Sequence, residues 1–321
     1  MKGNIQPKIS VVVPIHNEKA NLRILDREIH HALRGKSLSY EVIYVDDGST
    51  DGSTEVVRDL VEHNARKNHA IYLSRNFGQT AALKAGIKKS RGEILVPLDA
   101  DLQNLPADIP RLVSRLEKGE FDLVSGWRRL RQDQVLTRNI PSWVANRLIN
   151  FLFGIEIKDF GCSLKAYRSA YLKKIDLYGE MHRYIPILVH FQGGRITNEE
   201  VGHRKRSSGK TKYGLGRIPK VVLDLLLLKF LLDASHKPLH WFGGLGFLSF
   251  ILSLGSGALA VYLRLAKEVS FILTPLPLLT VFSFITGLIF LSLGLLSEIM
   301  VRIYYGKGGE DYFQERITRG Q

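Results

Sequence analysis

This sequence has little cysteine, and the glycine signatures of two common nucleotide-binding loops are missing from it. Cys162 is the one cysteine among 321 residues, which excludes an intramolecular disulfide and fits a reducing compartment. Residues 1–8 hold no apolar run of the signal-peptide kind, so we expect an N-terminus that is not exported. No G-x-G-x-x-G follows the first apolar run and no G-x-x-x-x-G-K-S/T occurs, which argues against a Rossmann dinucleotide fold and a P-loop.

Acidic residues are in the minority, since 31 Asp and Glu stand against 45 Lys and Arg, giving a formal net charge of +14. This balance predicts anionic partners, which are nucleic acid, phosphorylated ligands or an acidic membrane face. The most cationic stretch, RKRSSGKTK at 204–212, has little aromatic interleaving. We therefore expect no nucleic acid partner, and a phosphate or a lipid headgroup instead.

Charge is missing altogether from two long segments near the C-terminus. Trp241–Leu263 and Phe271–Ser297 run for about 23 and about 27 positions without a charged residue, and roughly 20 apolar residues span a bilayer. Because the connection 264–270 is short, they predict a transmembrane hairpin with both ends on one side. Four basic residues follow the second segment: Arg302, Lys307, Arg316 and Arg319. They favour a cytoplasmic C-terminus.

The chain therefore divides into four parts. Residues 1–215 carry charge throughout and predict a globular cytoplasmic domain. Residues 216–236 read as a juxtamembrane amphipathic helix, because charges interrupt their apolar run. Residues 237–301 form the predicted hairpin, and 302–321 are a polar cytoplasmic tail.

Strand and helix patterns alternate along the first part. The expected strands are Ile9–Val13 (ended by Pro14), Tyr40–Val45, Ala70–Ser74, Gly92–Leu98 and Phe121–Ser125. The expected helices are Thr54–Lys67, Asn76–Ser90, Ile109–Lys118 and Asn139–Phe153. This alternation predicts an α/β fold with a mostly parallel sheet and helices on both faces.

Paired carboxylates stand where the fourth strand ends. Asp99 and Asp101 follow a short apolar run, and ligands of open α/β sheets bind at the carboxyl ends of strands. Two hard oxygen ligands suit Mg²⁺ or Mn²⁺ carrying a substrate phosphate. The alternative is a solvated strand-to-loop turn.

The ends of the first two strands carry further polar residues. Asn17 and Glu18 follow the first strand, as candidates either for nucleotide contact or for capping the next helix. Asp46 and Asp47 follow the second strand and open a Gly and Ser/Thr/Asp cluster typical of a turn. A carboxylate here can accept hydrogen bonds from a base or a ribose.

Arginines gather after the fifth strand. Arg128, Arg131 and Arg138 lie in one short reach, and guanidinium groups match phosphate oxygens, so they predict a phosphate site. Asp159 precedes an aromatic residue and a glycine, which suits a loop carboxylate aimed at a site or a plain turn residue. Cys162 fits a small buried side chain better than a nucleophile, because no clear base accompanies it.

The motifs together carry a resemblance. VPIHNE (13–18), VDDGSTDG (45–52), DADLQ (99–103), GWRRLR, KDFGCSLKAYR and RSSGKTKYG look like those of family 2 glycosyltransferases with a GT-A fold. Their order and spacing resemble the polyisoprenyl-phosphate branch, which includes dolichol-phosphate mannose synthases and bactoprenol glucosyltransferases. The two C-terminal spans resemble the bacterial members. His16 departs from the aromatic residue that many members carry.

The resemblance implies roles at matching positions. It places Pro14, Asn17, Glu18, Asp46, Asp99, Gln103, Arg206 and Lys210 around the nucleotide sugar. It places Asp99, Asp101 and Gln103 around the Mg²⁺ or Mn²⁺, and Arg128, Arg131 and Arg138 on the lipid phosphate. It makes Asp101 and Asp159 the catalytic pair, with Asp159 either orienting the acceptor or accepting a proton.

The implied reaction is inverting transfer of a sugar from a nucleotide donor to a polyisoprenyl phosphate. Resemblance favours UDP-glucose and undecaprenyl phosphate, with GDP-mannose as an alternative donor. We expect a multi-pass protein of the inner (plasma) membrane with a cytoplasmic catalytic domain, and a homo-oligomer. Three rivals remain open: a polysaccharide synthase, a nucleotidyltransferase and a non-catalytic membrane adaptor. The first usually carries a Q-x-x-R-W-type motif and more spans.

Overall fold

The computed structural model describes residues 6–35, 38–129, 140–204, 223, 225–230, 232 and 238–306. Its contacts divide the chain into two units, Met1–Tyr213 and Gly214–Gln321. Each unit is taken by itself.

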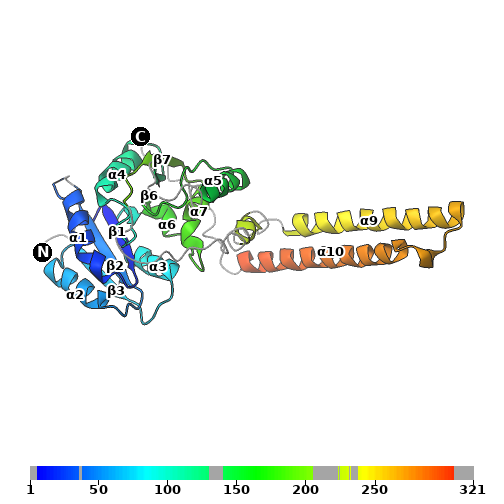
Figure 1. Cartoon of the computed structure of the whole chain (residues 1–321), viewed down its shortest axis with the longest axis horizontal. Coiled ribbons are helices and arrows are strands. Elements are labelled where there is room, and N and C mark those ends of the chain that lie inside the picture. The colour runs from blue at the N-terminus through cyan, green and yellow to red at the C-terminus, as the bar shows by residue number, and fades with distance from the viewer. Residues whose placement is uncertain are drawn as a thin grey trace. The chain divides into compact units, whose positions relative to one another are not determined.

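The first unit is built on a seven-stranded sheet with the order β3-β2-β1-β4-β6-β5-β7 (Figure 1). Its strands are β1 (Ile9–Ile15), β2 (Tyr40–Asp46), β3 (Asn68–Tyr72), β4 (Ile94–Pro97), β5 (Leu123–Trp127), β6 (Lys165–Arg168) and β7 (Ile196–Glu200). Strands β1 to β4 are parallel, β5 and β7 pair in parallel, and β6 is antiparallel to both β4 and β5. The predicted α/β class with a mostly parallel sheet is confirmed.

Helices cover both faces of the sheet because side chains alternate along each strand. Val11 and Val13 share a buried cluster with residues of α1, α2 and α4. Val12 faces α3 instead, where a Cβ on Gly86 would lie 2.3 Å from a Val12 methyl carbon. The helices are α1 (Lys19–Leu33), α2 (Ser53–His63), α3 (Gln79–Lys89), η1 (Pro106–Asp108), α4 (Ile109–Lys118), α5 (Ile140–Phe153), α6 (Ser169–Leu172), η3 (Met181–Arg183) and α7 (Ile185–Phe191).

The sequence predicts that Pro14 ends the first strand, and this prediction is wrong. β1 continues to Ile15, and Pro14 stands opposite Val45 of β2. Proline has no N–H to donate to a sheet. None is needed here, because Val12 is the last residue of β1 that pairs with β4, opposite Pro97.

Strands β6 and β7 are absent from the sequence expectations. β6 is only four residues long and lies between β4 and β5. It is antiparallel to both, whereas the sequence predicts that β4 and β5 are neighbours in a mostly parallel sheet. Its chain direction brings the preceding segment, 159–164, to the carboxyl ends of β4 and β5. This insertion places part of the candidate site described below.

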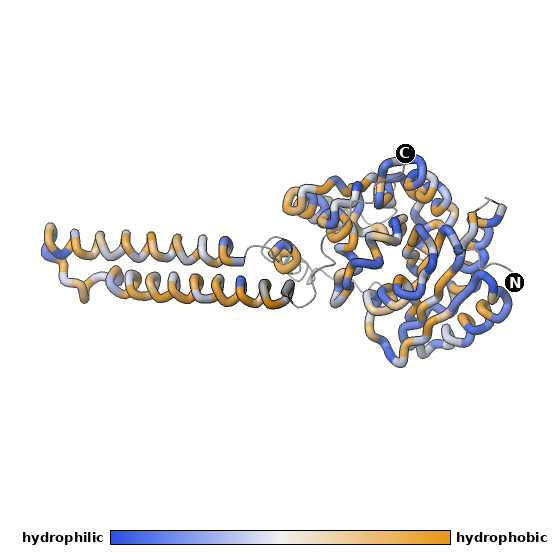
Figure 2. Tube along the Cα trace, turned by 180° about the vertical axis from the view of Figure 1, so that it is seen from behind, coloured by the Kyte–Doolittle hydropathy of each residue, from blue (hydrophilic) through white to orange (hydrophobic). Residues whose placement is uncertain are grey.

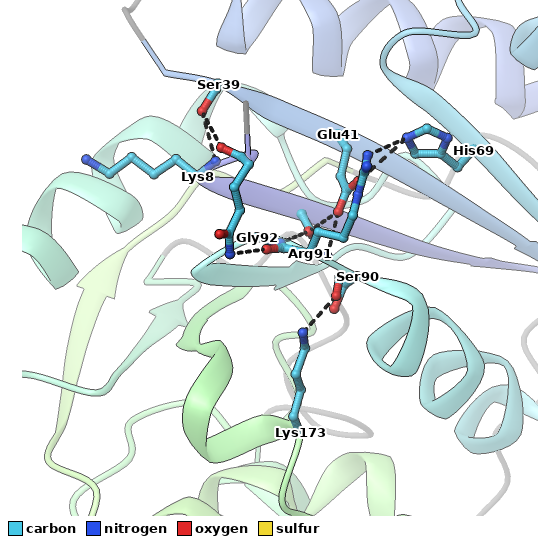
Figure 3. A network of polar contacts seen from close by, with 10 residues as sticks. Lys8, Ser39, Glu41, His69, Ser90, Arg91, Gly92 and Lys173 are labelled. Carbon is cyan, nitrogen blue, oxygen red and sulfur yellow. Dashed lines mark hydrogen bonds and ion pairs between the residues drawn. The ribbon is translucent and has the colours of Figure 1, made fainter. Parts of the chain in front are cut away.

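A polar cluster ties the amino ends of the central strands together (Figure 3). The Glu41 side chain, 2% exposed, accepts hydrogen bonds from Ser10 Oγ at 2.6 Å and from the backbone N and guanidinium of Arg91. Lys173 donates to the carbonyl of Ser90 at 2.8 Å from the other side of the same turn. Because these groups lie at the amino ends of the strands, we assign them a structural role.

The second unit contains two long apolar helices, α9 (Pro238–Lys267) and α10 (Leu276–Gly306), joined by a turn with the short helix η5 (Phe271–Leu273). Both are long and apolar enough to cross a membrane, over Pro238–Lys267 and Leu276–Val301 (Figure 2). They pack against each other closely: a Cβ on Gly246 would lie 3.1 Å from the carbonyl oxygen of Gly287. Of the predicted juxtamembrane helix, only 223, 225–230 and 232 are described, and they are helical.

Candidate active site at the carboxyl ends of the strands

The loops after β1, β2 and β3 are joined through His16. Its Nδ1 donates to the carbonyl of Asp47 at 2.9 Å, and its Nε2 accepts from Asn76 Nδ2 at 2.9 Å. A carbonyl only accepts and an amide nitrogen only donates, so the ring carries its proton on Nδ1. An imidazole meets both requirements, which gives His16 a role as a bridge between loops.

The Asn17 side chain contacts the loop after β2, whereas the Glu18 side chain accepts from Asn21 Nδ2 at 2.6 Å and only its backbone N reaches Ser53 Oγ, at 3.0 Å. Asn17 adopts φ 59°, and its Oδ1 accepts from the backbone N of Thr50 at 2.8 Å. Glu18 is the N-cap residue of α1, yet its side chain makes no capping hydrogen bond there. Instead Asp51 accepts from the backbone N of Lys19 at 3.1 Å. The capping alternative is therefore filled by Asp51 rather than by Asn17 or Glu18.

The two aspartates after β2 have internal partners. Asp46, 2% exposed, accepts from Ser49 N at 3.1 Å and from Thr54 Oγ1 at 2.5 Å. Asp47 accepts from the backbone N of Phe77 at 2.7 Å and of Gly78 at 2.9 Å, just before α3 begins. Both carboxylates thus hold the loops in shape. Contact of Asp46 with a nucleotide stays a prediction.

Gly48 is required where the same loop crosses the one after β3. It adopts φ +63°, and a Cβ there would lie 2.5 Å from the backbone carbonyl carbon of Arg75. Any side chain would push the two loops apart. The Gly in the VDDGSTDG motif therefore serves the close approach of backbone to backbone.

Asp99 and Asp101 lie just after β4, as the sequence predicts. Asp99 accepts from Gln79 Nε2 at 2.8 Å, while Asp101 accepts from the backbone N of Gln103 at 3.1 Å. Burial raises the pKa of Asp99, and the charge of Asp101 raises it further, against a hydrogen bond from Ser163. The charges of Lys165 and Arg128 oppose this rise, so the two carboxylates repel each other at the strand end with cations close by.

The residues present fit a divalent cation. Among the described residues no group of three or more His, Cys, Asp or Glu could hold a metal. Two carboxylates remain, with Gln103 beside them, and Mg²⁺ and Mn²⁺ are commonly held by one or two carboxylates plus substrate phosphates. The mutual repulsion of Asp99 and Asp101 is what a cation between them would relieve. A metal arriving with its substrate fits this donor set better than a resident structural metal.

Arg128 and Asp159 bind each other directly. The guanidinium donates from Nε to Oδ2 at 2.7 Å and from Nη2 to Oδ1 at 3.0 Å, and the two side chains are only 9% and 4% exposed. Such a forked, buried pair is strong and geometrically specific. The family resemblance implies that Arg128 lies on the acceptor phosphate and Asp159 at the reacting centre. The structure brings both together, each as the other's partner.

Sequence reasoning missed the groups that link the two carboxylate sites. Ser163 lies near Asp99, where its hydroxyl lowers the pKa of that carboxyl, and it accepts from Asn104 Nδ2 at 2.7 Å. Lys165, 4% exposed, donates to the backbone carbonyls of Phe160 and Cys162. The available signal was Lys165 itself, a lysine inside the motif KDFGCSLKAYR at a position that alternates with apolar residues. Cys162 is buried, as expected.

Four predicted site residues fall outside the described part of the chain. They are Arg131, Arg138, Arg206 and Lys210. Their assigned contacts with phosphate groups stay predictions.

Comparisons with known proteins bear on the whole chain. A sequence profile described as glycosyl transferase family 2 matches residues 10–176. Dodecaprenyl-phosphate galacturonate synthase of Rhizobium johnstonii is 40% identical over 306 residues, which cover 93% of this chain and 89% of that protein. Undecaprenyl-phosphate 4-deoxy-4-formamido-L-arabinose transferase of Aeromonas hydrophila is 34% identical over 316 residues, which cover 97% of this chain and 94% of that protein.

A solved structure matches the fold over most of the chain. Glucosyl-3-phosphoglycerate synthase of Mycobacterium tuberculosis, crystallised with Mn²⁺, UDP and glucosyl-3-phosphoglycerate, aligns with a TM-score of 0.53 at 23% identity. The match covers 70% of this chain and 80% of that one. It confirms the expected GT-A fold.

Proposed function

Because the chain belongs to glycosyl transferase family 2, we propose that it moves a sugar from a nucleoside diphosphate sugar to a polyprenyl phosphate in the membrane. The observation that carries this proposal is the pairing of two sites at one sheet edge. Asp99 and Asp101 suit a metal-bound diphosphate, and the Arg128–Asp159 pair suits a phosphate acceptor. Relatives of nearly full length whose names specify polyprenyl phosphates, and two apolar helices on the same chain, support a lipid acceptor.

The donor sugar is the finer part of the proposal. UDP-glucose follows from the sequence resemblance, with GDP-mannose as the alternative. The two relatives above carry galacturonate and 4-deoxy-4-formamido-L-arabinose in their names, so a donor panel must include a uronic acid and a pentose. Acceptors of undecaprenyl and dodecaprenyl length belong in the same panel.

The chemistry requires little from a general base. A phosphate monoester has a second pKa near about 6, so the acceptor is largely dianionic at neutral pH. One phosphate oxygen attacks the anomeric carbon, the bond from that carbon to the diphosphate oxygen breaks, and the configuration inverts. A divalent metal, when bound, stabilises the departing nucleoside diphosphate.

The protein's own residues orient and hold the two anions. Both oxygens of Asp159 engage Arg128, which supports an orienting role for Asp159 over proton removal. The guanidinium offers an incoming lipid phosphate a forked partner that is already fixed in place. Asp99 and Asp101 face the donor diphosphate. Bringing two reactants into one geometry can supply a large part of the acceleration in such a reaction.

The membrane arrangement follows from the same proposal. A cytoplasmic catalytic domain meets a soluble donor, and the two spans keep it at the surface where the lipid phosphate lies. The bacterial inner membrane is the compartment that the sequence expectation names. The expected homo-oligomer stays a prediction, which the particle mass in nanodiscs tests.

A donor and acceptor panel tests the function. The purified full chain is incubated with radiolabelled UDP- and GDP-sugars, polyprenyl phosphate and Mg²⁺ or Mn²⁺. We expect a labelled lipid and a free nucleoside diphosphate. Release of pyrophosphate would instead indicate a nucleotidyltransferase, a polymeric product would indicate a polysaccharide synthase, and no nucleotide binding would leave a membrane adaptor.

A further inference from the structure

Lys165 is the buried cation that the proposed reaction does not yet use. It lies on β6, between β4, which leads to Asp99, and β5, which leads to Arg128. Its side chain is 4% exposed, and lysine is almost never that buried without partners. Burial lowers the pKa of Lys165, and the nearby Asp159 opposes that shift. We therefore looked for what the buried ammonium group of Lys165 holds in place.

The ammonium group of Lys165 donates its hydrogen bonds to the backbone of one short turn. Nζ donates to the carbonyl of Cys162 and, at 3.3 Å, to the carbonyl of Phe160. The same turn is closed by the backbone N of Cys162, which donates to the carbonyl of Asp159 at 3.4 Å. Lys165 therefore ties down the segment 159–163 from beneath, through its main chain.

The two ends of that turn serve the two halves of the candidate site. At one end, Asp159 holds the guanidinium of Arg128. At the other, Ser163 lies near Asp99, whose pKa its hydroxyl lowers, and Ser163 Oγ accepts from Asn104 Nδ2 at 2.7 Å. A shift of this turn would move the acceptor side and the donor side relative to each other.

Charge balance points the same way. Asp99, Asp101 and Asp159 bring three negative charges to this edge of the sheet, against the positive charges of Arg128 and Lys165. A divalent cation would make the sum positive, which suits a site that must hold two phosphorylated anions together. Lys165 supplies part of that positive charge without offering a competing ligand at the surface.

We propose that Lys165 is a positioning residue, whose ammonium group locks the 159–163 turn so that Asp159 and Ser163 hold the acceptor and donor sides in register. This inference rests on the proposed function for its catalytic consequence. The lock itself is a property of the folded chain and is testable without any substrate.

The sole cysteine of the chain reports on the lock. Cys162 lies in the turn, is 0% exposed, and its carbonyl accepts from Lys165. Opening of the turn exposes the thiol to a reagent such as a maleimide. Loss of the lysine charge by itself would slow labelling, because Lys165 lowers the pKa of a thiol that burial raises. Faster labelling of a variant can therefore come only from opening.

The experiment compares four variants of the full chain in nanodiscs. Lys165→Met removes the donors but keeps an unbranched side chain, Lys165→Gln keeps one donor group, and Lys165→Arg keeps the charge. Lys173→Met is the matched control, because Lys173 also donates to a backbone carbonyl but at the opposite end of the sheet (Figure 3). Labelling is measured well below the melting temperature of each variant, so that global unfolding does not contribute.

We expect Cys162 to label at least about tenfold faster in Lys165→Met, a change equivalent to about 1.4 kcal/mol in the opening equilibrium. Lys165→Gln falls between, and Lys165→Arg and Lys173→Met stay at the rate of the unaltered chain. Labelling of Lys165→Met at that same rate, or equally fast labelling of Lys173→Met, overturns the proposal.

Catalysis supplies the second readout. If the unaltered chain transfers sugar, Lys165→Met lowers kcat about a hundredfold, as expected for misplacement of reacting groups, with UDP affinity unchanged. A variant with normal kcat contradicts the catalytic part of the inference. An unaltered chain that transfers nothing contradicts the proposed function instead, and the labelling rates still decide whether Lys165 locks the turn.

Discussion

At the scale of single residues, the forked contact between Arg128 and Asp159 changes what each residue is expected to do. An arginine that already holds a carboxylate is fixed in direction before any phosphate arrives. In the proposed reaction, the acceptor phosphate would meet a guanidinium whose direction Asp159 has already set. An orienting role is consistent with both carboxylate oxygens of Asp159 accepting hydrogen bonds from Arg128.

The first prediction separates acceptor from donor binding. Arg128→Ala deletes a charge-assisted contact worth roughly 1.5 to 3 kcal/mol. We therefore expect a loss of about ten- to a hundredfold in apparent affinity for polyprenyl phosphate. UDP affinity, measured by calorimetry, should barely change, because the donor is assigned to Asp99, Asp101 and the first-strand loop.

Arg129→Ala is the matched control for that experiment. Arg129 is the next residue, and its side chain is 64% exposed and only 3.7 Å from Glu200. Its removal should leave both titrations near those of the unaltered chain. Lost UDP affinity in Arg128→Ala with unchanged dependence on lipid would move Arg128 to the donor side.

The second prediction concerns the metal. If Asp99 and Asp101 hold Mg²⁺ or Mn²⁺ with the donor diphosphate, EDTA abolishes transfer and added metal restores it. Asp101→Ala should lose activity at any metal concentration while its melting temperature stays close to normal. The control is Asp176→Ala, whose exposed carboxylate pairs with Lys84 away from the candidate site. Full activity of Asp101→Ala in EDTA would refute the metal site.

At the scale of whole elements, the sheet separates a structural end from a functional end. Ion pairs with a buried carboxylate occur at both ends: Glu41 with the half-exposed Arg91 at the amino ends of the strands, and Asp159 with the buried Arg128 at the carboxyl ends. The first joins β1, β2 and the turn before β4. The second joins β5 to the turn before β6. Only the second lies where ligands of α/β sheets bind.

The third prediction tests the structural role of Glu41 through pH. Burial raises its pKa, but hydrogen bonds from Ser10 and Arg91 outweigh this, so the folded-state pKa lies below the usual 4.5. A lowered carboxyl pKa stabilises the fold above the unfolded-state value, and that stability is lost as the pH falls through the folded-state value.

Glu41→Gln should therefore lower the melting temperature at pH 7, through the loss of charge-assisted contacts worth about 1.5 to 3 kcal/mol. The gap to the unaltered chain should close as the pH drops below 4.5. Thermal unfolding in detergent across this range measures both. A gap that is constant with pH would show that the charge of Glu41 does not contribute to stability.

Local pattern predicted most elements, and tertiary contacts decided the rest. Helix α4 begins and ends where the sequence indicates, because its apolar stripe is regular and a glycine follows it. β6 and β7 were missed, since KAYR and ITNEE are short and lack the apolar runs of buried strands. The carboxyl-end position of Asp99 and Asp101 was readable from one strand alone.

The contacts within the site were not readable in that way. Arg128 and Asp159 are 31 positions apart, and their pairing depends on the antiparallel insertion of β6 between β4 and β5. The role of Lys165 depends on the same insertion. The sequence identified Arg128 and Asp159 as candidate site residues but did not predict the ion pair between them. That pair depends on the order of the strands in the sheet and not on a local motif.

At the scale of the whole molecule, an excess of positive charge accompanies two apolar helices. A net charge of +14 favours the surface of an anionic membrane, and the hairpin α9–α10 would fix the chain there. A substrate that is itself a membrane lipid then stays within reach of the catalytic domain. For a cytoplasmic nucleotide donor, we expect both ends of the hairpin to face the cytoplasm.

The fourth prediction tests that orientation. Lys267 is the last residue of α9, next to the turn that leads to α10, whereas Gly320 lies in the predicted tail beyond the described residues. In intact cells, a cysteine at Lys267 should react with a membrane-impermeant maleimide, and a cysteine at Gly320 should react only after permeabilisation. The native Cys162 is buried and gives the background rate. If Gly320→Cys labels in intact cells and Lys267→Cys does not, the hairpin is inverted, and a cytoplasmic nucleotide donor could not reach the site.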